Sequence, residues 1–181
     1  MRRVLILGCA GAGKSTLARQ LGKALALPVF HLDAIFWKPG WVMTPADEEE
    51  IILQRIVAGE KWIIDGNYAG NLNIRLPRAD TILFMDFPRR VCLWRVVRRW
   101  MMFRGKQRPD MGPDCPEKID LEFLQWIWNY NRDVKPQVLA LVDEYRSGKN
   151  IRALRSSREV RDLLASIEAE AKAPKQTEPA H

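Results

Sequence analysis

The chain has 181 residues, of which 47% are hydrophobic and 28% charged, a composition that excludes a mainly disordered chain and allows one domain with a sizeable core. Lys and Arg number 29 against 22 Asp and Glu, which gives a formal net charge of +7. This excess favours an anionic partner, and it does not distinguish a nucleotide from a nucleic acid or an acidic membrane surface.

The first predicted element is a buried strand at residues 4–7, and it leads directly into a phosphate-binding P-loop. Residues 8–15 read Gly-Cys-Ala-Gly-Ala-Gly-Lys-Ser, which fills every fixed position of the template Gly, four residues, Gly, Lys, Ser or Thr. Residues 15–25 follow with apolar side chains at helical spacing. A dinucleotide-binding fingerprint does not fit, because Thr16 stands where that pattern needs a third glycine.

Each residue type in this loop has a chemical role. Glycines let backbone N–H groups curl around a phosphate, and the following helix points its positive end at the anion. Lys14 supplies a mobile charge for the β- and γ-phosphates, and the hydroxyl of Ser15 is a ligand for Mg²⁺. We therefore expect ATP and Mg²⁺ as cofactors and Lys14 as a catalytic residue. The residues predicted to bind the nucleotide are Gly8, Gly11, Ala12, Gly13, Lys14, Ser15 and Thr16.

Two aspartates stand at the ends of the next predicted strands. Asp33 follows the strand at 29–32, and Asp65 closes the strand at 62–65. Ligands of open α/β sheets bind beyond the carboxyl ends of the strands. We expect Asp33 to orient the acceptor hydroxyl or take its proton, and Asp65 to contact the acceptor and support Mg²⁺ with Ser15. The alternative is that each is only a cap or turn residue.

The segments around the third strand add an acceptor side to this site. A helix is predicted between Thr44, as its N-cap, and Gly59, with Pro45 in its first position. Gly66 gives room for the acceptor, and Arg75 is expected to bind an acceptor phosphate or carboxylate. A solvated surface charge is the alternative for Arg75.

After the fourth predicted strand, at 81–85, a helix carries a basic cluster. At 100° per residue its arginines fall opposite an apolar face, which predicts either a solvated charged face or guanidiniums that close over transferring phosphates. In the second interpretation Arg95 and Arg99 are catalytic. The arginines are Arg95, Arg98 and Arg99, and the apolar face comprises Leu93, Trp94, Val96, Val97, Trp100 and Met101.

The segment at 100–116 is rich in Gly, Pro and basic residues, which predicts a mobile loop. Its Arg104 and Arg108 are further candidates for binding the nucleotide phosphates. A fifth strand is predicted at 150–154. The polar stretch at 170–181, with two prolines, predicts a disordered tail.

Together these residues resemble the P-loop nucleoside and nucleotide kinase group, which includes adenylate kinase. Asp65-Gly66 resembles the group's acceptor-phosphate loop, with Arg75 as the counterpart of its arginine. Arg95 and Arg99 keep the spacing of the group's arginines in the helix that leads to the lid. The resemblance implies an ATP-dependent phosphotransferase with an arginine-bearing lid.

Within this group the chain is most similar to the bacterial adenylate-kinase-like proteins often called DNA topology modulation proteins. The similar stretches include His31-Leu32-Asp33 and the run from Trp62 through Tyr68. Adenylate kinases have Gly-Phe-Pro-Arg where this chain has Gly66-Asn67-Tyr68-Ala69, so AMP-specific contacts are not implied. The family label implies DNA binding, although the sequence contains no helix-turn-helix or other nucleic-acid motif.

Cysteine usage bears on the compartment. Cys9, Cys92 and Cys115 lie far apart and form no Cys-x-x-Cys motif, which argues against disulfides or zinc and favours a cytoplasmic protein. The apolar run before Gly8 is too short for a secretion signal, and no stretch is long and apolar enough to cross a membrane. No membrane partner is expected, and the oligomeric state stays open.

The sequence thus predicts an α/β fold, a doubly wound five-stranded parallel sheet of the P-loop nucleotide-kinase type. A kinase-like domain at 1–169 is expected to contain an acceptor-side flank at about 33–76 and a lid at about 100–130. The predicted function is transfer of the γ-phosphoryl group of ATP to a small acceptor, possibly a nucleoside or nucleotide. The alternative function is a nucleotide-binding regulator that contacts DNA through its basic surface.

Overall fold

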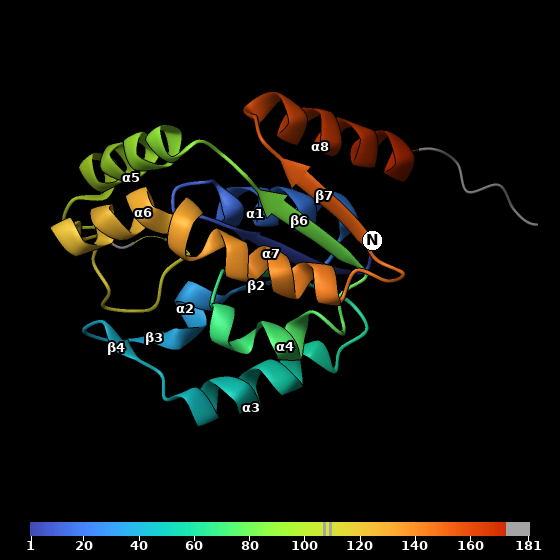
Figure 1. Cartoon of the computed structure of the whole chain (residues 1–181), viewed down its shortest axis with the longest axis horizontal. Helices are drawn as coiled ribbons and strands as arrows, with labels where there is room; N and C mark the ends of the chain where they lie inside the picture. Colours follow the sequence, from blue (N-terminus) through green and yellow to red (C-terminus); the bar gives the residue numbers. More distant parts are fainter. Residues whose placement is uncertain (107, 109, 173–181) are drawn as a thin grey trace, which may run out of the picture.

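The fold is built on a parallel sheet of five strands in the order β2-β5-β1-β6-β7 (Figure 1). The computed structural model describes residues 1–106, 108 and 110–172. Each predicted strand is confirmed to within two residues at either end. The strands are β1 (Arg3–Gly8), β2 (Val29–His31), β5 (Trp62–Asp65), β6 (Thr81–Met85) and β7 (Asn150–Leu154), and the hairpin strands are β3 (Trp37–Lys38) and β4 (Val42–Met43).

Helices cover both faces of this sheet, as the doubly wound prediction requires. Figure 1 shows α8 and α1 on one side of the strands and α3 and α4 on the other. The helices are α1 (Lys14–Leu25), α2 (Leu32–Phe36), α3 (Ala46–Val57), α4 (Leu72–Arg75), α5 (Arg89–Phe103), α6 (Leu121–Asp133), α7 (Lys135–Glu144) and α8 (Ser157–Lys172), with a 3₁₀ turn at Ala69–Asn71.

Strand β1 shows why the sheet needs two covering layers. Val4 and Ile6 contribute to the core beneath α1, α5 and α8, whereas Leu5 and Leu7 contribute to the core on the side of α3, α4 and α7. All four side chains are completely buried. Successive side chains of a strand point to opposite faces, so a continuous apolar run is what a strand between two helical layers requires.

Two predicted helix limits need correction. Thr44 is not an N-cap, because α3 begins at Ala46 with Pro45 in the cap position. The N–H of Thr44 instead donates a hydrogen bond of 2.8 Å to the carbonyl of Phe36. Helix α5 continues to Phe103, so the first four residues of the segment predicted as a loop at 100–116 are helical.

The C-terminal helix also extends further than expected. Helix α8 ends at Lys172, so it includes the first three residues of the predicted tail at 170–181. Residues 173–181 lie outside the described residues. Within the residues that the structure describes, no helix is long and apolar enough to span a membrane.

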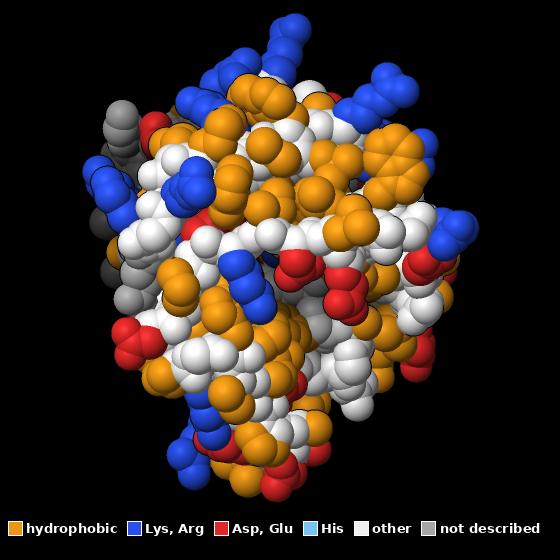
Figure 2. All heavy atoms as spheres, turned by 90° about the vertical axis from the view of Figure 1, so that its left-hand side faces the viewer, with side chains coloured by type: hydrophobic (Ala, Val, Ile, Leu, Met, Phe, Trp, Pro, Cys, Tyr) orange, Lys and Arg blue, Asp and Glu red, His pale blue; other side chains and the backbone are white. Residues whose placement is uncertain are grey.

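The buried face of α5 does not coincide with the apolar face that its periodicity defines. Its buried residues are Cys92 and Val96, whereas Trp94 and Met101 are 60% and 62% exposed. Figure 2 faces the side of the molecule that carries α5 and α6, and hydrophobic side chains gather there among Lys and Arg. The helix is turned so that Arg95 and Arg99 face inward, where each has a polar partner.

Candidate active site

Most of the predicted site residues line one cavity of about 810 Å³ beyond the carboxyl ends of β1, β2 and β5. Its walls come from the P-loop, the segments after β2 and β5, and the region between α5 and α7. The lining includes Gly11, Gly13, Lys14, Ser15, Thr16, Asp33, Gly66, Arg95, Arg99 and Arg108 from the predicted set. Cavities of this size hold drug-sized or cofactor-sized ligands.

The glycines of the P-loop are required by both conformation and contact. Gly8, Gly11 and Gly13 have φ of 137°, 77° and 100°, in the left-handed region that disfavours other residues. A Cβ on Gly11 would lie 2.3 Å from the carbonyl oxygen of Cys92, and one on Gly8 would lie 2.6 Å from that of Met85. The loop therefore packs directly on α5 and β6, and Ala12 is fully buried behind it.

Two cations donate hydrogen bonds to carbonyls of the P-loop. The Nζ atom of Lys14 donates a hydrogen bond of 3.1 Å to the carbonyl of Cys9, across the loop. Arg95 donates from Nη1 to the carbonyl of Ala12 at 2.9 Å and from Nη2 to the hydroxyl of Ser157 at 2.9 Å. Arg95 thereby ties α5 and the start of α8 to the loop, a positioning contact that the sequence did not predict.

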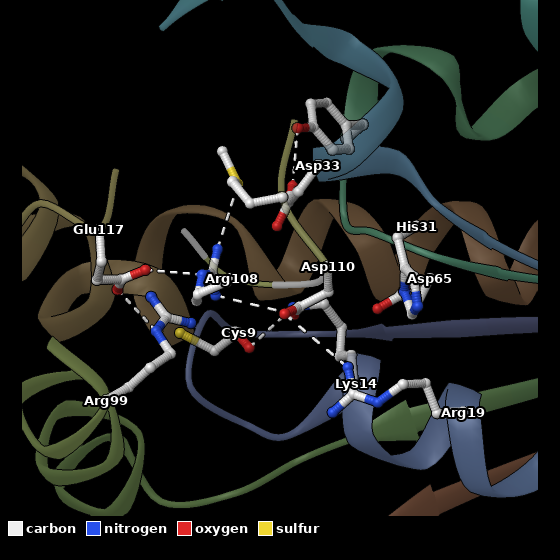
Figure 3. Close-up of polar contacts among 12 residues, drawn as sticks. Cys9, Lys14, Arg19, His31, Asp33, Asp65, Arg99, Arg108, Asp110 and Glu117 are labelled. Carbon is white, nitrogen blue, oxygen red and sulfur yellow. Dashed lines mark hydrogen bonds and ion pairs between the residues drawn. The ribbon is translucent and has the colours of Figure 1, made fainter. Parts of the chain in front are cut away.

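Two further arginines share a buried carboxylate. Arg99 Nε lies 2.8 Å from one oxygen of Glu117, and Arg108 Nε lies 2.7 Å from the other (Figure 3). The side chain of Glu117 is 2% exposed and that of Arg108 is 8% exposed. Burial and the neighbouring charge of Arg108 lower the pKa of Arg99, while Glu117 opposes this shift. The carboxylate thus holds both guanidiniums at the cavity wall.

The prediction for Arg104 is not supported by its position. Its guanidinium carbon lies 5.4 Å from the ring centroid of Trp100, its side chain is exposed, and it does not line the cavity. Its backbone pairs with that of Glu117, which fixes the start of the segment that carries Arg108.

Asp110 is a site residue that sequence reasoning missed. Its carboxylate lies 3.8 Å from Arg108 Nη1 and 3.9 Å from Arg19 Nη1, and it lines the same cavity as Ser15. Burial raises the pKa of Asp110, but Arg108, Ser15 and Arg19 outweigh burial and lower it. The sequence offers no local signal that singles out Asp110, because Asp114, Glu117 and Asp120 are further acids nearby.

The acceptor side is built around Asp33, the second residue of α2. The hydroxyl of Tyr68 donates a hydrogen bond of 2.8 Å to Asp33 Oδ1. Burial and the Asp33 charge raise the pKa of Tyr68, so its hydroxyl stays protonated and continues to donate. Phe36 packs edge-on against Tyr68 with ring centroids 5.0 Å apart. The aromatic residues that line the cavity are Trp37, Trp41, Tyr68, Phe103, Phe123 and Trp126.

Asp65 does not occupy the predicted position beside Ser15. Its side chain is 4% exposed, its Oδ1 lies 2.6 Å from Nδ1 of His31, and it does not line the cavity. Burial lowers the pKa of His31, but the hydrogen bond and charge of Asp65 outweigh burial and raise it above the ordinary value of 6.5. His31 is therefore a half-buried partner of Asp65, and this pair lies outside the cavity lining.

Gly66 lies at the acceptor side as predicted, but Arg75 does not. Gly66 has φ of 142°, and a Cβ there would lie 2.8 Å from the Cβ of Leu32. Arg75 is fully buried beneath this loop and donates to the carbonyls of Gly66 at 2.9 Å and Tyr68 at 2.8 Å. Its guanidinium therefore shapes the acceptor loop from behind and has no surface for an acceptor anion.

The residues present fit a Mg²⁺ ion that is held mainly by phosphate oxygens. Among the described residues, no group of three or more His, Cys, Asp or Glu could hold a metal by itself. Mg²⁺ is commonly bound by one or two protein oxygens together with substrate phosphates and water. The hydroxyl of Ser15 beside the carboxylate of Asp110 is a donor set of this kind.

Comparison with solved structures confirms the fold. The shikimate kinase from Acinetobacter baumannii in complex with shikimate is similar with a TM-score of 0.62 and 16% identity, covering 97% of this chain and 96% of that chain. The shikimate kinase from Bacteroides thetaiotaomicron is similar with a TM-score of 0.52 and 17% identity, covering 93% of this chain and 97% of that chain. No protein-family model and no curated protein sequence matches the chain. At these identities the likeness shows the P-loop kinase fold alone.

Replacing Arg75 with Met should unfold the chain more easily. The change leaves several buried carbonyls of the acceptor loop without a donor, which is expected to lower the free energy of unfolding by about 3 kcal/mol or more. Urea denaturation followed by circular dichroism measures it. Arg78→Met is the matched control, because Arg78 is exposed. Equal stability of the two variants would contradict the structural role of Arg75.

The His31–Asp65 pair should make stability depend on pH with a defined sign. Because the folded pKa of His31 is raised, its stabilisation is complete below the unfolded value of about 6.5 and is lost as the pH rises through the folded pKa. The advantage of the wild type over His31→Gln in free energy of unfolding should therefore shrink as the pH rises above about 6.5. In an NMR titration, Asp65→Asn should lower the pKa of His31. An unchanged pKa would contradict the pairing.

Proposed function

We propose that the chain is an ATP-dependent phosphotransferase that acts on a small acceptor. The observation that carries this proposal is that one cavity joins a complete P-loop, an arginine-bearing wall and the carboxylate of Asp33. Phosphoryl transfer needs mainly positioning and electrostatic stabilisation, which this arrangement supplies. The fold shared with two shikimate kinases is compatible with the same reaction class.

On the nucleotide side, the backbone of the P-loop and Lys14 would hold the β- and γ-phosphates. Lys14 donates a hydrogen bond to the carbonyl of Cys9 in this structure. When phosphate binds, Lys14 would exchange this neutral hydrogen-bond partner for a charged one. Arg99 and Arg108 line the same cavity and can stabilise charge on the group in transfer. Arg95 acts on this step by holding the loop, because its guanidinium is already bonded to Ala12.

On the acceptor side, Asp33 would receive a hydrogen bond or a proton from the acceptor hydroxyl. Tyr68 donates to one of its oxygens, which fixes the carboxylate and leaves the other for the acceptor. A carboxylate so placed can orient the hydroxyl for in-line attack on the γ-phosphorus. A Mg²⁺ ion near Ser15 would supply neutralisation of phosphate charge.

The chemistry of the wall bears on the acceptor, for which a nucleoside or nucleotide is our proposal. Trp37, Trp41 and Tyr68 offer aromatic faces close to Asp33, a surface suited to a planar ring. Among the described residues of the flank at 33–76, no Lys or Arg lines the cavity. Arg75, the expected cation, is fully buried outside this lining. These features support a nucleoside more than an acceptor that carries its own phosphate.

Domain roles follow from the same placement. We propose that the flank at about 33–76 binds the acceptor and that the segment at about 100–130, with Arg108 and Glu117, acts as the lid within one domain. The alternative function, a regulator that contacts DNA, needs an outward arginine face. Arg95 and Arg99 instead point inward to Ala12 and Glu117, so that surface loses two of its three arginines.

A screen of purified protein with ATP against nucleosides, nucleotides and small hydroxylated metabolites tests the proposal. Release of ADP that depends on one acceptor, with a phosphorylated product in equal amount, is the expected result. Absence of transfer to all of them, combined with tight salt-sensitive binding of duplex DNA, would favour the regulator instead.

Lys14→Ala should abolish phosphoryl transfer and weaken ATP binding by about tenfold or more, since it removes the mobile charge at the phosphates. Isothermal titration with ATP and the rate of ADP release measure both effects. Lys23→Ala is the matched control, because Lys23 is an exposed lysine on the same helix. A folded Lys14→Ala protein that still turns over ATP at the normal rate would refute the site.

Asp33→Asn should lower kcat by about a hundredfold or more while ATP affinity changes little, because the residue lies beside the acceptor. Single-turnover rates and ATP titrations separate the two quantities. Tyr68→Phe, which removes the donor to Asp33 but keeps the carboxylate, should have a smaller effect. If the variant lost affinity for ATP but used the acceptor normally, the acceptor role of Asp33 would be refuted.

A further inference from the structure

Carboxylates occupy four of the described lining positions of the cavity, and Asp110 differs from the other three. Asp33 accepts from Tyr68, Glu117 binds two arginines, and Asp120 caps α6 by accepting from the N–H of Phe123. Each of these three has a short polar contact within the protein. Asp110 is instead paired with Arg19 of α1, the helix that begins in the P-loop, and it lines the cavity together with Ser15.

The charge of Asp110 is held by two ion pairs that are longer than hydrogen bonds. Its distances to Arg19 and Arg108 are 3.9 and 3.8 Å, which are ion pairs but too long for hydrogen bonds. Its side chain is 15% exposed and lies on the cavity wall. Figure 3 shows the carboxylate directed toward these two cations beside the P-loop. An oxygen in this position is available to a further cation.

A bound triphosphate would change the balance of charge around Asp110. The phosphates would compete for Arg19 and Arg108, the two cations that now neutralise the carboxylate. A carboxylate left beside a polyanion is repelled unless a cation lies between them. Mg²⁺ at the hydroxyl of Ser15 would be such a cation, and carboxylate oxygens are ligands that it prefers.

We propose that Asp110 binds, together with Ser15, the Mg²⁺ ion that accompanies the triphosphate. This inference rests on the proposed function, since it presumes that ATP occupies the P-loop. It assigns the metal carboxylate to the segment between α5 and α6, in place of Asp65, which is engaged by His31. The segment that carries Arg108 would then respond to the metal as well as to the phosphates.

Thermodynamic linkage between metal and nucleotide tests the proposal without measuring turnover. Isothermal titration gives the affinity for ATP with EDTA and with saturating Mg²⁺, for the wild type and for Asp110→Asn. Because Asn lacks the charge, the variant should bind metal-free ATP more tightly, and the Mg²⁺-dependent gain in affinity should shrink about fivefold or more. Asp114→Asn is the matched control, an exposed aspartate in the same segment that does not line the cavity.

A second variant covers the case in which Asp110→Asn fails to fold. Asp110→Cys should gain affinity for ATP from Cd²⁺ more than from Mg²⁺, because a thiolate prefers the softer metal. An unchanged Mg²⁺-dependent gain in Asp110→Asn, or no preference for Cd²⁺ in Asp110→Cys, would overturn the metal role while the proposed function stands. A wild type that binds no ATP with or without Mg²⁺ would overturn both.

Discussion

The direct packing of the P-loop backbone against α5 and β6 is the constraint on which the site depends. Gly11 lies against the carbonyl of Cys92 and Gly8 against that of Met85, so neither position can accept a Cβ without moving backbone. Arg95 then fastens the carbonyl of Ala12 to the same helix. Because one helix both supports the phosphate loop and carries Arg99 into the cavity, the distance between the loop and the arginine wall is fixed by backbone contact. Side-chain flexibility has little influence on it.

The cations of the cavity are neutralised or bonded within the protein before any ligand arrives. Glu117 holds two guanidiniums, Asp110 approaches two, and Lys14 donates to a loop carbonyl. Such partners order long side chains in advance, which reduces the entropy that binding would otherwise have to overcome. They also keep like charges from repelling one another in the empty site. The cost is that an incoming anion must compete with carboxylates, so selectivity for a highly charged ligand such as a triphosphate follows.

Local patterns in the sequence were sufficient for the sheet and the P-loop, because a buried parallel strand and a glycine-rich anion loop are specified by adjacent residues. They failed where a side chain's partner lies outside its own helix or strand. Arg75 was expected to bind an acceptor anion, whereas the carbonyls of Gly66 and Tyr68 surround it in the fold. The periodicity of α5 left open whether its arginines are solvated or face the site, because the partner of Arg95, Ala12, lies 83 residues away. The acids Asp110 and Glu117 belong to no local motif, and only the fold shows what they face.

The buried Arg75 has a consequence for how the acceptor side can vary. Because a fully buried guanidinium holds the loop that follows β5 by its carbonyls, the course of that backbone is independent of the side chains that the loop presents to the cavity. Trp37 and Trp41 also line the cavity, and they belong to a separate element, the β3–β4 hairpin. The side chains that line the cavity near this loop can therefore be replaced one at a time without moving its backbone. Under this condition the acceptor specificity of the fold can change, by divergence or by design, while its backbone stays the same.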